Sequence, residues 1–536
     1  MSKPKEAVFL RQTSGLVRRI STTDALLFNI YMISVGGALT SLFLILLALN
    51  PGTDGSLSFF LWTYVFIIPS FCWGMMASIF PRSGGDYVYN TRILTPFTGF
   101  IVNWMLVIWT IFFAAFFAYW TSITGFGTAF FTYGLVFDVP WLLDASLFFV
   151  STNGIFITGT LVLLFYFVMV VLPPKVYFTF QKATFIPAIV GLVVAFIAFA
   201  ITPQDKFMPL FNSVLEPIAG ANYYQQVIDA AGTTGFVAPT FSWNAVWWSL
   251  NLIAMANAIT WYSAYFGSEI KKVEKSQIIS IPGAAIIVGT MTGIGAFLQT
   301  RTAGADFLHA LAFQGYIMGD LPQGMPIDIF FYPFMGSVIF RIPVLVALMC
   351  LSNIIWQPAY IMACVMPPTR SIVAWSMDRL VPGWFGGVNR KFSTPHNAAL
   401  VVFVLGDIFL AIYTYTTWLT YASGLFFLML STFFVSIAAT ILPWRLPDIF
   451  DASPIGKYKV GRIPLMSIVG AASFVVSFFI LYQYAVYTPA GFNTMVNLQV
   501  ATIILVAGLV VYAYAKVVSK RRGIDLSVAY REVPPV

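Results

Sequence analysis

Charged residues are scarce in this chain. Only 9% of its 536 residues are Asp, Glu, Lys or Arg, whereas a soluble globular domain carries about 25%. Hydrophobic residues make up 59%, and the mean hydropathy is +0.85. No stretch is polar enough to form a separate soluble domain. The composition excludes an ordinary soluble enzyme and predicts a membrane protein.

Cysteine and histidine are also rare. The three cysteines, Cys72, Cys350 and Cys364, each lie in an apolar run and have no metal-ligand spacing, which excludes a disulfide framework and a zinc site. The two histidines, His309 and His396, fall in predicted loops. Within the apolar segments we find no pair or triad of His, Asp, Cys or Ser that would support catalysis. We therefore expect neither enzymatic activity nor a resident cofactor.

Several other signals are missing. There is no Gly-x-x-x-x-Gly-Lys-Ser/Thr loop for a nucleotide. The first twenty residues are polar and basic and lack the apolar stretch and cleavage site of a signal peptide, so we expect them to remain in the mature chain. The net charge of +8 is divided among short stretches between apolar runs, which argues against a nucleic-acid partner and for a membrane-orientation signal.

Long apolar segments are the main positive feature. A spanning helix needs about 20 apolar residues, because 1.5 Å per residue must cross a hydrocarbon core of about 30 Å. Such segments lie at residues 25–49, 57–80, 97–125, 153–173, 180–202, 243–268, 278–300, 332–366, 398–415, 418–442, 463–486 and 496–518. The apolar loop 126–152 has room for a further short helix. The sequence predicts an all-α polytopic protein with about twelve transmembrane helices, embedded in the lipid bilayer.

The basic residues supply an independent test of this topology. With a cytoplasmic N-terminus, only Lys206, Arg301 and Arg341 of the 28 Lys and Arg residues fall outside, which leaves 25 inside. The acidic residues show no such bias. This asymmetry is typical of membrane insertion, and one missed span would destroy it. We expect a multi-pass protein of the cell membrane with both termini in the cytoplasm.

Two of the segments are interrupted. The first contains the adjacent glycines Gly36 and Gly37, which disfavour helix and let backbone groups face a cavity. The sixth contains polar residues such as Asn251, Asn257 and Thr260. Corresponding breaks in two segments of opposite direction are typical of transporters built from inverted repeats. The alternative is that small residues allow close helix packing and that asparagines bond across helices.

Three sequence blocks identify a family. They are Phe80-Pro81-Arg82-Ser83-Gly84-Gly85-Asp86-Tyr87-Val88-Tyr89 after the second segment, Phe266-Gly267-Ser268-Glu269-Ile270-Lys271-Lys272 with Ile281-Pro282 after the sixth, and Thr369-Arg370-Ser371, Met377-Asp378-Arg379-Leu380-Val381-Pro382, Val388-Asn389 and Thr394-Pro395 after the eighth. In this order and at these positions, they resemble the amino acid permeases of the amino acid–polyamine–organocation (APC) superfamily. With twelve spans, the resemblance covers essentially the whole chain.

The resemblance implies a LeuT-like fold of 5+5 inverted repeats plus two C-terminal helices. The implied divisions are a cytoplasmic segment 1–23, a first repeat 24–202, an extracellular loop 203–242, a second repeat 243–442, a last pair of helices with its preceding loop 443–518, and a cytoplasmic tail 519–536. Two departures affect the site. The glycines of the first segment are adjacent where the family often has Gly-x-Gly, and the connection from Glu269 to Pro282 is longer than usual.

The resemblance also implies that the carboxylate and ammonium groups of an amino acid or amine substrate are held by backbone at the two breaks. A helix N-terminus offers N–H groups and a positive dipole to an anion, and freed carbonyl groups accept a cation. The predicted substrate-binding residues are Ser34, Val35, Gly36, Gly37, Asn103, Ala258, Ile259, Thr260 and Trp261, with Trp104 and Thr110 as further wall candidates. Trp261 is either a platform for the substrate or a packing residue.

The sequence offers several candidates for the residues that would couple transport to an ion. Ser352, Asn353 and Gln357 lie midway along the eighth segment, where their oxygens would complete an ion site or bond between helices. Asp407 is the acidic residue well inside a predicted span, at a cost of roughly 3 kcal/mol unless paired, protonated or wetted. It is either a proton carrier or a residue nearer the interface. Lys182 lies near the cytoplasmic end of the fifth segment, so the coupling lysine of some family members has no counterpart deeper in this span. A proton and a sodium ion both remain candidates.

Charged residues at the predicted cytoplasmic helix ends, Asp86, Glu269, Arg370 and Asp378, would form ion pairs that latch an inward-closed state. If exposed, each pair would contribute at most about 1 kcal/mol; the alternative is that these charges only orient the chain. The predicted function is secondary active transport of amino acids or related amines by alternating access, with a mild preference for neutral or aromatic substrates. A transporter-like membrane sensor, a membrane-embedded enzyme and a channel are the alternatives.

Overall fold

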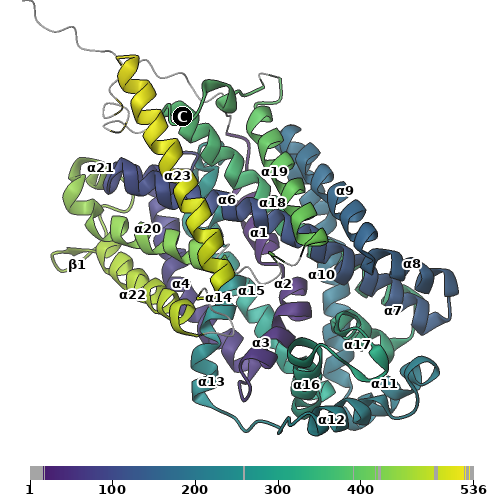
Figure 1. Cartoon of the computed structure of the whole chain (residues 1–536). Helices are drawn as coiled ribbons and strands as arrows, with labels where there is room; N and C mark the ends of the chain where they lie inside the picture. Colours follow the sequence, from purple (N-terminus) through teal and green to yellow (C-terminus); the bar gives the residue numbers. More distant parts are fainter. Residues whose placement is uncertain are drawn as a thin grey trace, which may run out of the picture.

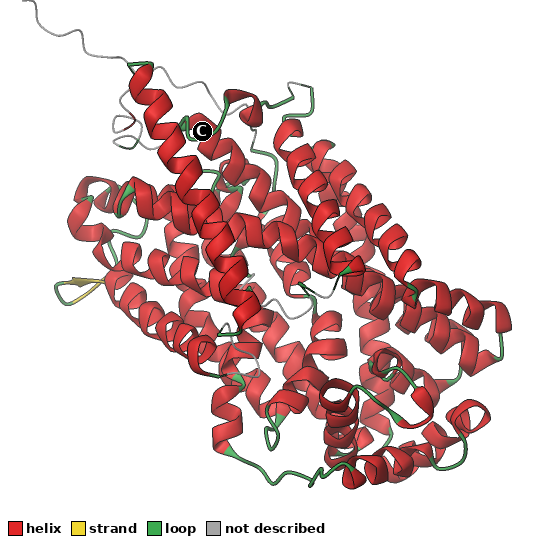
Figure 2. Ribbon diagram, viewed as in Figure 1, coloured by secondary structure: helices red, strands yellow, loops and turns green. Residues whose placement is uncertain are grey.

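A computed structural model describes residues 16, 18–257, 260–389, 391–416, 418–419, 424–487, 493–523, 526 and 530. The described chain is almost entirely helical (Figures 1 and 2). The strands within it are β1 (Lys459–Val460) and β2 (Ile463–Pro464), an antiparallel hairpin in which Lys459 pairs with Pro464. The predicted all-α polytopic fold is confirmed.

Eleven helical stretches among the described residues are long and apolar enough to cross a membrane. They are Thr22–Leu49, Gly55–Ile79, Pro96–Phe137, Thr152–Val171, Pro174–Ile201, Val273–Ala303, Pro343–Met377, His396–Tyr415, Leu425–Arg445, Leu465–Val486 and Met495–Arg521. Each coincides with one of the twelve predicted segments. The predicted sixth segment, 243–268, is absent from this set because it is divided among short pieces.

The helices that build these stretches have the following bounds. The first stretch consists of α1 (Thr22–Ile33), α2 (Val35–Gly37), the π-helical η1 (Ala38–Leu42) and α3 (Phe43–Leu49). Next come α4 (Gly55–Ile79), α5 (Asp86–Ile93), α6 (Pro96–Trp120), the π-helical η2 (Thr121–Gly127), α7 (Thr128–Phe137), α8 (Pro140–Val150), α9 (Thr152–Val171) and α10 (Pro174–Ile201). The later helices include α15 (Val273–Ala303), α18 (Pro343–Met377), α19 (His396–Tyr415), α20 (Leu425–Arg445), α22 (Leu465–Val486) and α23 (Met495–Arg521).

Shorter elements connect them. They are α11 (Gln204–Ala219), α12 (Tyr223–Thr233), α13 (Trp243–Trp248), α14 (Leu250–Asn257), η3 (Tyr262–Tyr265), η4 (Gly267–Glu269), α16 (Ala305–Ala312), η5 (Phe313–Met318), η6 (Pro322–Gly324), η7 (Ile327–Ile329), α17 (Tyr332–Phe340), η8 (Gly383–Gly386) and α21 (Pro447–Asp451). Helices α11, α12, α16 and α17 gather at one end of the molecule (Figure 1). Because α11 and α12 lie within residues 203–242, the predicted extracellular loop is largely helical.

Three boundaries differ from the predictions. The third span continues through the π turn η2 to Phe137, and the apolar loop 126–152 contains α7 and α8. The predicted segment 332–366 is two helices. Helix α17 ends at Phe340, Arg341 adopts a left-handed conformation (φ 38°), and α18 starts at Pro343. Proline has no N–H to continue the preceding helix, and it holds Ile342 in an extended conformation, so the helix must restart there.

The predicted loop positions of the two histidines are wrong. His396 is the first residue of α19. His309 lies in α16 and is buried, because the apolar face of this helix packs against α3. Burial lowers the pKa of His309, which favours its neutral form.

Helix α18 is the central element of the bundle. It packs along α10 and α6, and it also contacts α1, α2 and η2. Helix α15 runs along α4, and α20 runs along α22. Large apolar side chains such as Leu161 on α9, Ile197 on α10 and Val510 on α23 are exposed, as expected for surfaces that face lipid. The first broken span is therefore enclosed by other helices, whereas α9, α10 and α23 carry lipid-facing surfaces.

Candidate functional site

The first span breaks at Ser34. Helix α1 ends at Ile33, and Ser34 adopts a left-handed conformation (φ 52°, ψ 87°), which costs a residue with a side chain about 1–2 kcal/mol. The Ser34 Oγ accepts a hydrogen bond from the Gly37 N–H (3.0 Å) and donates one to the Trp356 carbonyl of α18 (2.7 Å). One hydroxyl therefore caps the restarted helix and ties the break to α18.

The adjacent glycines allow α18 to approach this break closely. A Cβ atom on Gly36 would lie 2.4 Å from the Trp356 ring, and one on Gly37 would lie 2.8 Å from the Tyr360 ring. Both distances are shorter than carbon atoms tolerate, so neither position accepts a side chain without movement of α18. These glycines therefore allow close helix packing, which was the alternative explanation for them, and they also lie at the break.

The second break follows α14. Two of the predicted binding residues, Ala258 and Ile259, lie outside the described residues. Thr260 and Trp261 form the turn that precedes η3, and the Thr260 Oγ1 lies 3.2 Å from the Ser70 Oγ of α4. The Trp261 ring is buried and stacks on Trp73 of α4, with 5.5 Å between centroids and 7° between planes. In this conformation Trp261 packs against α4.

Side-chain amides connect the two breaks. Asn29 of α1 donates to the Ser263 Oγ (2.9 Å) and accepts from the Ser263 N–H (3.2 Å). The Ser263 Oγ donates to Gln277 of α15 (2.7 Å), whose Nε2 donates to the Ser263 carbonyl (3.0 Å). These bonds replace the helical hydrogen bonds that the unwound stretch lacks. The sequence predictions omitted Asn29 and Gln277; an uncharged amide in an apolar run was a signal for Asn29, whereas Gln277 precedes its apolar segment and follows a charged stretch.

Of the predicted wall residues, Thr110 contacts the second break: its Oγ1 lies 3.3 Å from the Tyr262 hydroxyl. Asn103 instead accepts a hydrogen bond from the Trp375 indole (2.8 Å) and donates to Asp86 (2.7 Å). Trp104 donates to the Ile504 carbonyl of α23 (3.0 Å). Asn103 and Trp104 therefore bond away from the breaks in this conformation.

The candidate coupling residues of α18 all bond to other helices. The Ser352 Oγ donates to the Ala188 carbonyl of α10 (2.6 Å), and the Asn353 amide donates to the Thr124 carbonyl of η2 (2.6 Å). Gln357 donates to the Thr40 hydroxyl of η1 (2.8 Å). This arrangement is the one expected if these residues connect helices.

Asp407 lies half-buried on α19 and accepts a hydrogen bond from the Thr160 hydroxyl of α9 (2.7 Å). Within the described residues, no hydrogen bond joins Asp407 to either break. Lys182 pairs with Asp24 in the first turn of α1 (2.7 Å). No group of three His, Cys, Asp or Glu side chains in the described part of the chain is arranged to hold a metal ion.

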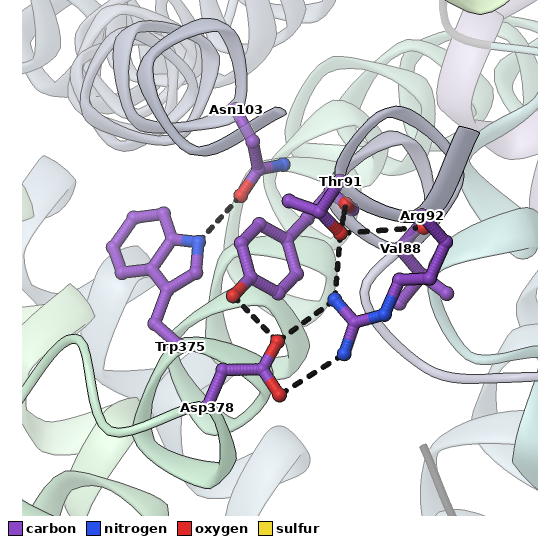
Figure 3. A network of polar contacts seen from close by, with 7 residues as sticks. Val88, Thr91, Arg92, Asn103, Trp375 and Asp378 are labelled. Carbon is purple, nitrogen blue, oxygen red and sulfur yellow. Dashed lines mark hydrogen bonds and ion pairs between the residues drawn. The ribbon is translucent and has the colours of Figure 1, made fainter. Parts of the chain in front are cut away.

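A polar network lies at the end of the bundle that is predicted to be cytoplasmic. Asp378, at the end of α18, accepts a hydrogen bond from the Tyr87 hydroxyl (2.7 Å) and pairs with Arg92 of α5 through both carboxylate oxygens (2.8 and 3.0 Å). Figure 3 shows Asp378 facing the two terminal nitrogens of Arg92, with the indole nitrogen of Trp375 directed at Asn103. The side chains of Arg92 and Asp378 are only 3% and 2% exposed.

Asp86 is the centre of this network. Its Oδ1 accepts hydrogen bonds from Asn103 and from the Tyr265 hydroxyl (both 2.7 Å), and its Oδ2 accepts one from the Ser431 hydroxyl of α20 (2.8 Å). The side chain is completely buried. Burial raises the pKa of Asp86 to about 6, although the donated hydrogen bonds oppose the shift. We call Tyr87, Asp86, Arg92, Glu269, Arg370 and Asp378 with their partners the latch.

The second ion pair of the latch joins Glu269 to Arg370 of α18 in a bidentate geometry, at 2.9 and 3.1 Å. Both side chains are 1% exposed, so the expectation of exposed, weak pairs is wrong. The physical reason is local. The N-terminal segment lies against the backbone of Glu269, because the N–H groups of Arg19 and Ile20 bond to the Glu269 carbonyl. A buried pair of this kind makes each partner depend strongly on the other.

Comparison with known proteins is consistent with this architecture. No curated protein matches the chain. The sequence profile of a family described as amino acid permease matches residues 22–509, which include both breaks and the whole latch. This chain therefore belongs to the amino acid permease family of the APC superfamily, as its three sequence blocks predicted.

Proposed function

We propose that this permease is a secondary active transporter that moves amino acids or closely related amines across the cell membrane by alternating access. The observation that carries the proposal is the pair of broken spans, which Asn29 and Ser263 hold against each other in the interior of the bundle. The twelve-span inverted-repeat topology, with both termini in the cytoplasm, is part of the same proposal.

The substrate carboxylate would bind the N–H groups that follow the Ser34 break, where the helix restarts and its positive dipole end points into the interior. The ammonium group would bind carbonyl groups freed at the second break, around Thr260 and Trp261. In the described conformation, Trp356 and Tyr360 fill the space beside the glycines. Substrate binding therefore requires α18 and the first span to separate.

The side chains near the breaks favour an uncharged substrate side chain. Ser34, Thr260 and Trp261 carry no charge, and the two described ion pairs of the latch are satisfied internally. A neutral or aromatic amino acid fits this environment better than an acidic or basic one. The latch would hold the cytoplasmic side closed while the substrate enters from the other side. Coupling to a proton, to sodium or to a second substrate is left to experiment.

The test is uptake of radiolabelled amino acids by the purified chain in proteoliposomes, with a proton gradient, a sodium gradient or neither. We expect saturable uptake that needs no ATP. Gly36→Ala and Gly37→Ala should each lower kcat/KM at least about tenfold, equivalent to about 1.4 kcal/mol, because a methyl group enters the space between the break and α18.

Two matched glycines serve as controls. A Cβ atom on Gly232 of α12 would meet open space, so Gly232→Ala should leave uptake unchanged. Gly289 of α15 is as crowded as Gly36 but packs on Thr63 of α4, so Gly289→Ala should lower stability without changing KM. If folded protein binds amino acids without moving them, the chain is a sensor. If it neither binds nor moves them, the proposed substrate class is wrong.

A further inference from the structure

An apolar cavity of about 910 Å³ lies outside the broken spans, between α6, α18, α19 and α23. Its walls are largely apolar and combine aliphatic side chains such as Ile108, Leu405 and Val510 with the aromatic rings of Trp104 and Phe385. Figure 1 shows α23 crossing the bundle in front of α6 and α18, and α23 carries exposed apolar side chains on its outer surface. The cavity thus opens beside the surface that faces lipid tails.

One end of this cavity is basic. Arg379, which follows α18, and Arg522, which follows α23, both line it, together with the hydroxyls of Ser376 and Ser519. Both arginine residues are exposed. None of the residues that line the cavity in the described chain is acidic. Two helices that are far apart in the sequence therefore bring two guanidinium groups to the end of one apolar space.

The backbone at Arg379 makes this position unusual. The Leu380 N–H bonds to the Trp375 carbonyl, and the Arg379 N–H bonds to the Ser376 carbonyl, which is the Schellman arrangement at a helix C-terminus. In that arrangement the residue with positive φ is usually glycine, yet Arg379 occupies it at φ 62°. The chain thus keeps an arginine where glycine would cost less conformational energy.

The chemistry of the cavity defines its ligand. An apolar space beside the lipid surface suits acyl or alkyl chains, and two neighbouring guanidinium groups can bind phosphate through several charge-assisted hydrogen bonds. The positive-inside pattern places this basic end in the cytoplasmic leaflet, where basic pockets between helices bind anionic headgroups. We propose that the cavity is a binding site for an anionic phospholipid, with its phosphate on Arg379 and Arg522 and its chains between α6, α19 and α23.

The site adjoins the latch. Trp375 lines the cavity and donates its indole N–H to Asn103, which in turn donates to Asp86 (Figure 3). Arg379 directly follows Asp378, the partner of Arg92. A lipid in the cavity would therefore hold Trp375 and the end of α18 in the geometry that closes the latch. This second step rests on the proposed transport function, whereas the lipid site itself does not.

The first experiment is native mass spectrometry of the delipidated full-length chain, titrated with phosphatidylglycerol or with phosphatidylcholine of the same chain composition. We expect the wild-type chain to prefer phosphatidylglycerol by about tenfold or more, since two arginines contact the headgroup. The Arg379→Gly, Arg522→Gln double variant should bind both lipids equally. Equal binding of the two lipids by the wild type, or unchanged preference in the double variant, would overturn the proposal.

Folding and charge have separate controls. Glycine favours the Schellman position, so the Arg379→Gly backbone should remain folded, which the melting temperature without lipid checks. Lys457→Gln with Lys459→Gln removes the same charge from the exposed β1 hairpin region and should leave the lipid preference intact. If this control lost the preference for phosphatidylglycerol as fully as the arginine double variant, net charge alone would explain the binding, and a specific site would be refuted.

Two further outcomes would exclude a lipid occupant. If inorganic phosphate at the same concentration raised the melting temperature as much as phosphatidylglycerol, the arginines would bind a free anion. If the mass spectra showed a dimer that the double variant loses, a second copy of the chain would occupy the cavity. Lipid binding by a chain that transports nothing would leave the site in place and refute only the transport proposal.

Discussion

At the residue scale, the sequence predicted the positions of the breaks but not the interactions that hold them. Adjacent glycines located the first break to within a few residues. The residue that bends the chain is Ser34, whose left-handed conformation depends on bonds to Gly37 and Trp356. Trp356 is distant in sequence, so no local pattern could have indicated this contact. The candidates Ala258 and Ile259 lie outside the described residues, and Asn103 serves the latch instead.

Ser34 offers a test of the break itself. Ser34→Ala and Ser34→Gly both remove the hydroxyl bonds to Gly37 and Trp356, but glycine adopts positive φ without strain. We expect Ser34→Gly to be more stable than Ser34→Ala by about 1 kcal/mol. Chemical unfolding in detergent micelles measures the difference. Equal stability of the two variants would contradict the left-handed conformation.

Asp86 predicts a pH dependence of stability. Its pKa in the folded chain, about 6, is above the unfolded value near 3.9, so folding favours its protonated form. The stability that this residue contributes is complete below pH 4 and is lost as the pH rises through 6, by a total on the order of 3 kcal/mol. Asp86→Asn should remove this loss, because an amide accepts from Asn103 and donates to Ser431 at every pH.

The relevant quantity is the difference between wild type and Asp86→Asn in unfolding free energy, measured from pH 4 to pH 7. Other titrating groups are common to both proteins and cancel in this difference. A difference that stays constant across the range would show that the buried carboxyl does not titrate there.

At the scale of elements, the sequence placed the latch residues at the same helix ends and provided no information on their pairing or burial. Arg92 was absent from the predicted latch because its partner, Asp378, lies on α18, far along the chain. Their positions at predicted helix ends led us to expect exposed side chains, yet Glu269 and Arg370 are each only 1% exposed. Burial changes the energetics, since an uncompensated buried charge costs far more than a broken surface pair.

The Glu269–Arg370 pair should therefore show strong coupling. Glu269→Gln and Arg370→Met should each destabilise the fold by about 3–5 kcal/mol, and the double variant should lose much less than the sum. Lys182→Gln, which breaks the half-exposed pair with Asp24, should cost no more than about 1 kcal/mol. Additive losses at Glu269 and Arg370 would show that the pair does not act as a unit.

At the scale of the whole molecule, eleven of the predicted spans were predictable because lipid imposes long apolar helices on any such chain. The family was predictable from the three sequence blocks. The helices outside the spans were not. Helices such as α11 and α12 in the connection 203–242, and α17 before α18, pack on neighbouring helices that hydropathy does not describe. Repeat symmetry, membrane orientation and coupling stay predictions for functional experiments.

A buried cysteine provides a measure of opening. Cys364 lies on α18, is 2% exposed, and should be inert while the latch is closed. In a Cys72→Ala, Cys350→Ala background, Arg92→Gln should raise the alkylation rate of Cys364 at least about tenfold, since a shift of about 1.4 kcal/mol toward the open state suffices. Lys457→Gln, on the hairpin, should leave the rate unchanged. An unchanged rate in the Arg92 variant would mean that the latch does not control access.

The amide bridge of Asn29, Ser263 and Gln277 has a mechanical consequence. It joins α1, the unwound stretch and α15, and the backbone bonds of Arg19 and Ile20 to Glu269 extend the joint to the N-terminal segment. We expect these parts to move together as one rigid unit. Opening the cytoplasmic side would then break the bonds that cross the edge of this unit, among them Tyr265 to Asp86, Arg370 to Glu269 and the Gly84 N–H to the Tyr265 carbonyl. These bonds would have to break together, so opening of the cytoplasmic side is expected to be cooperative.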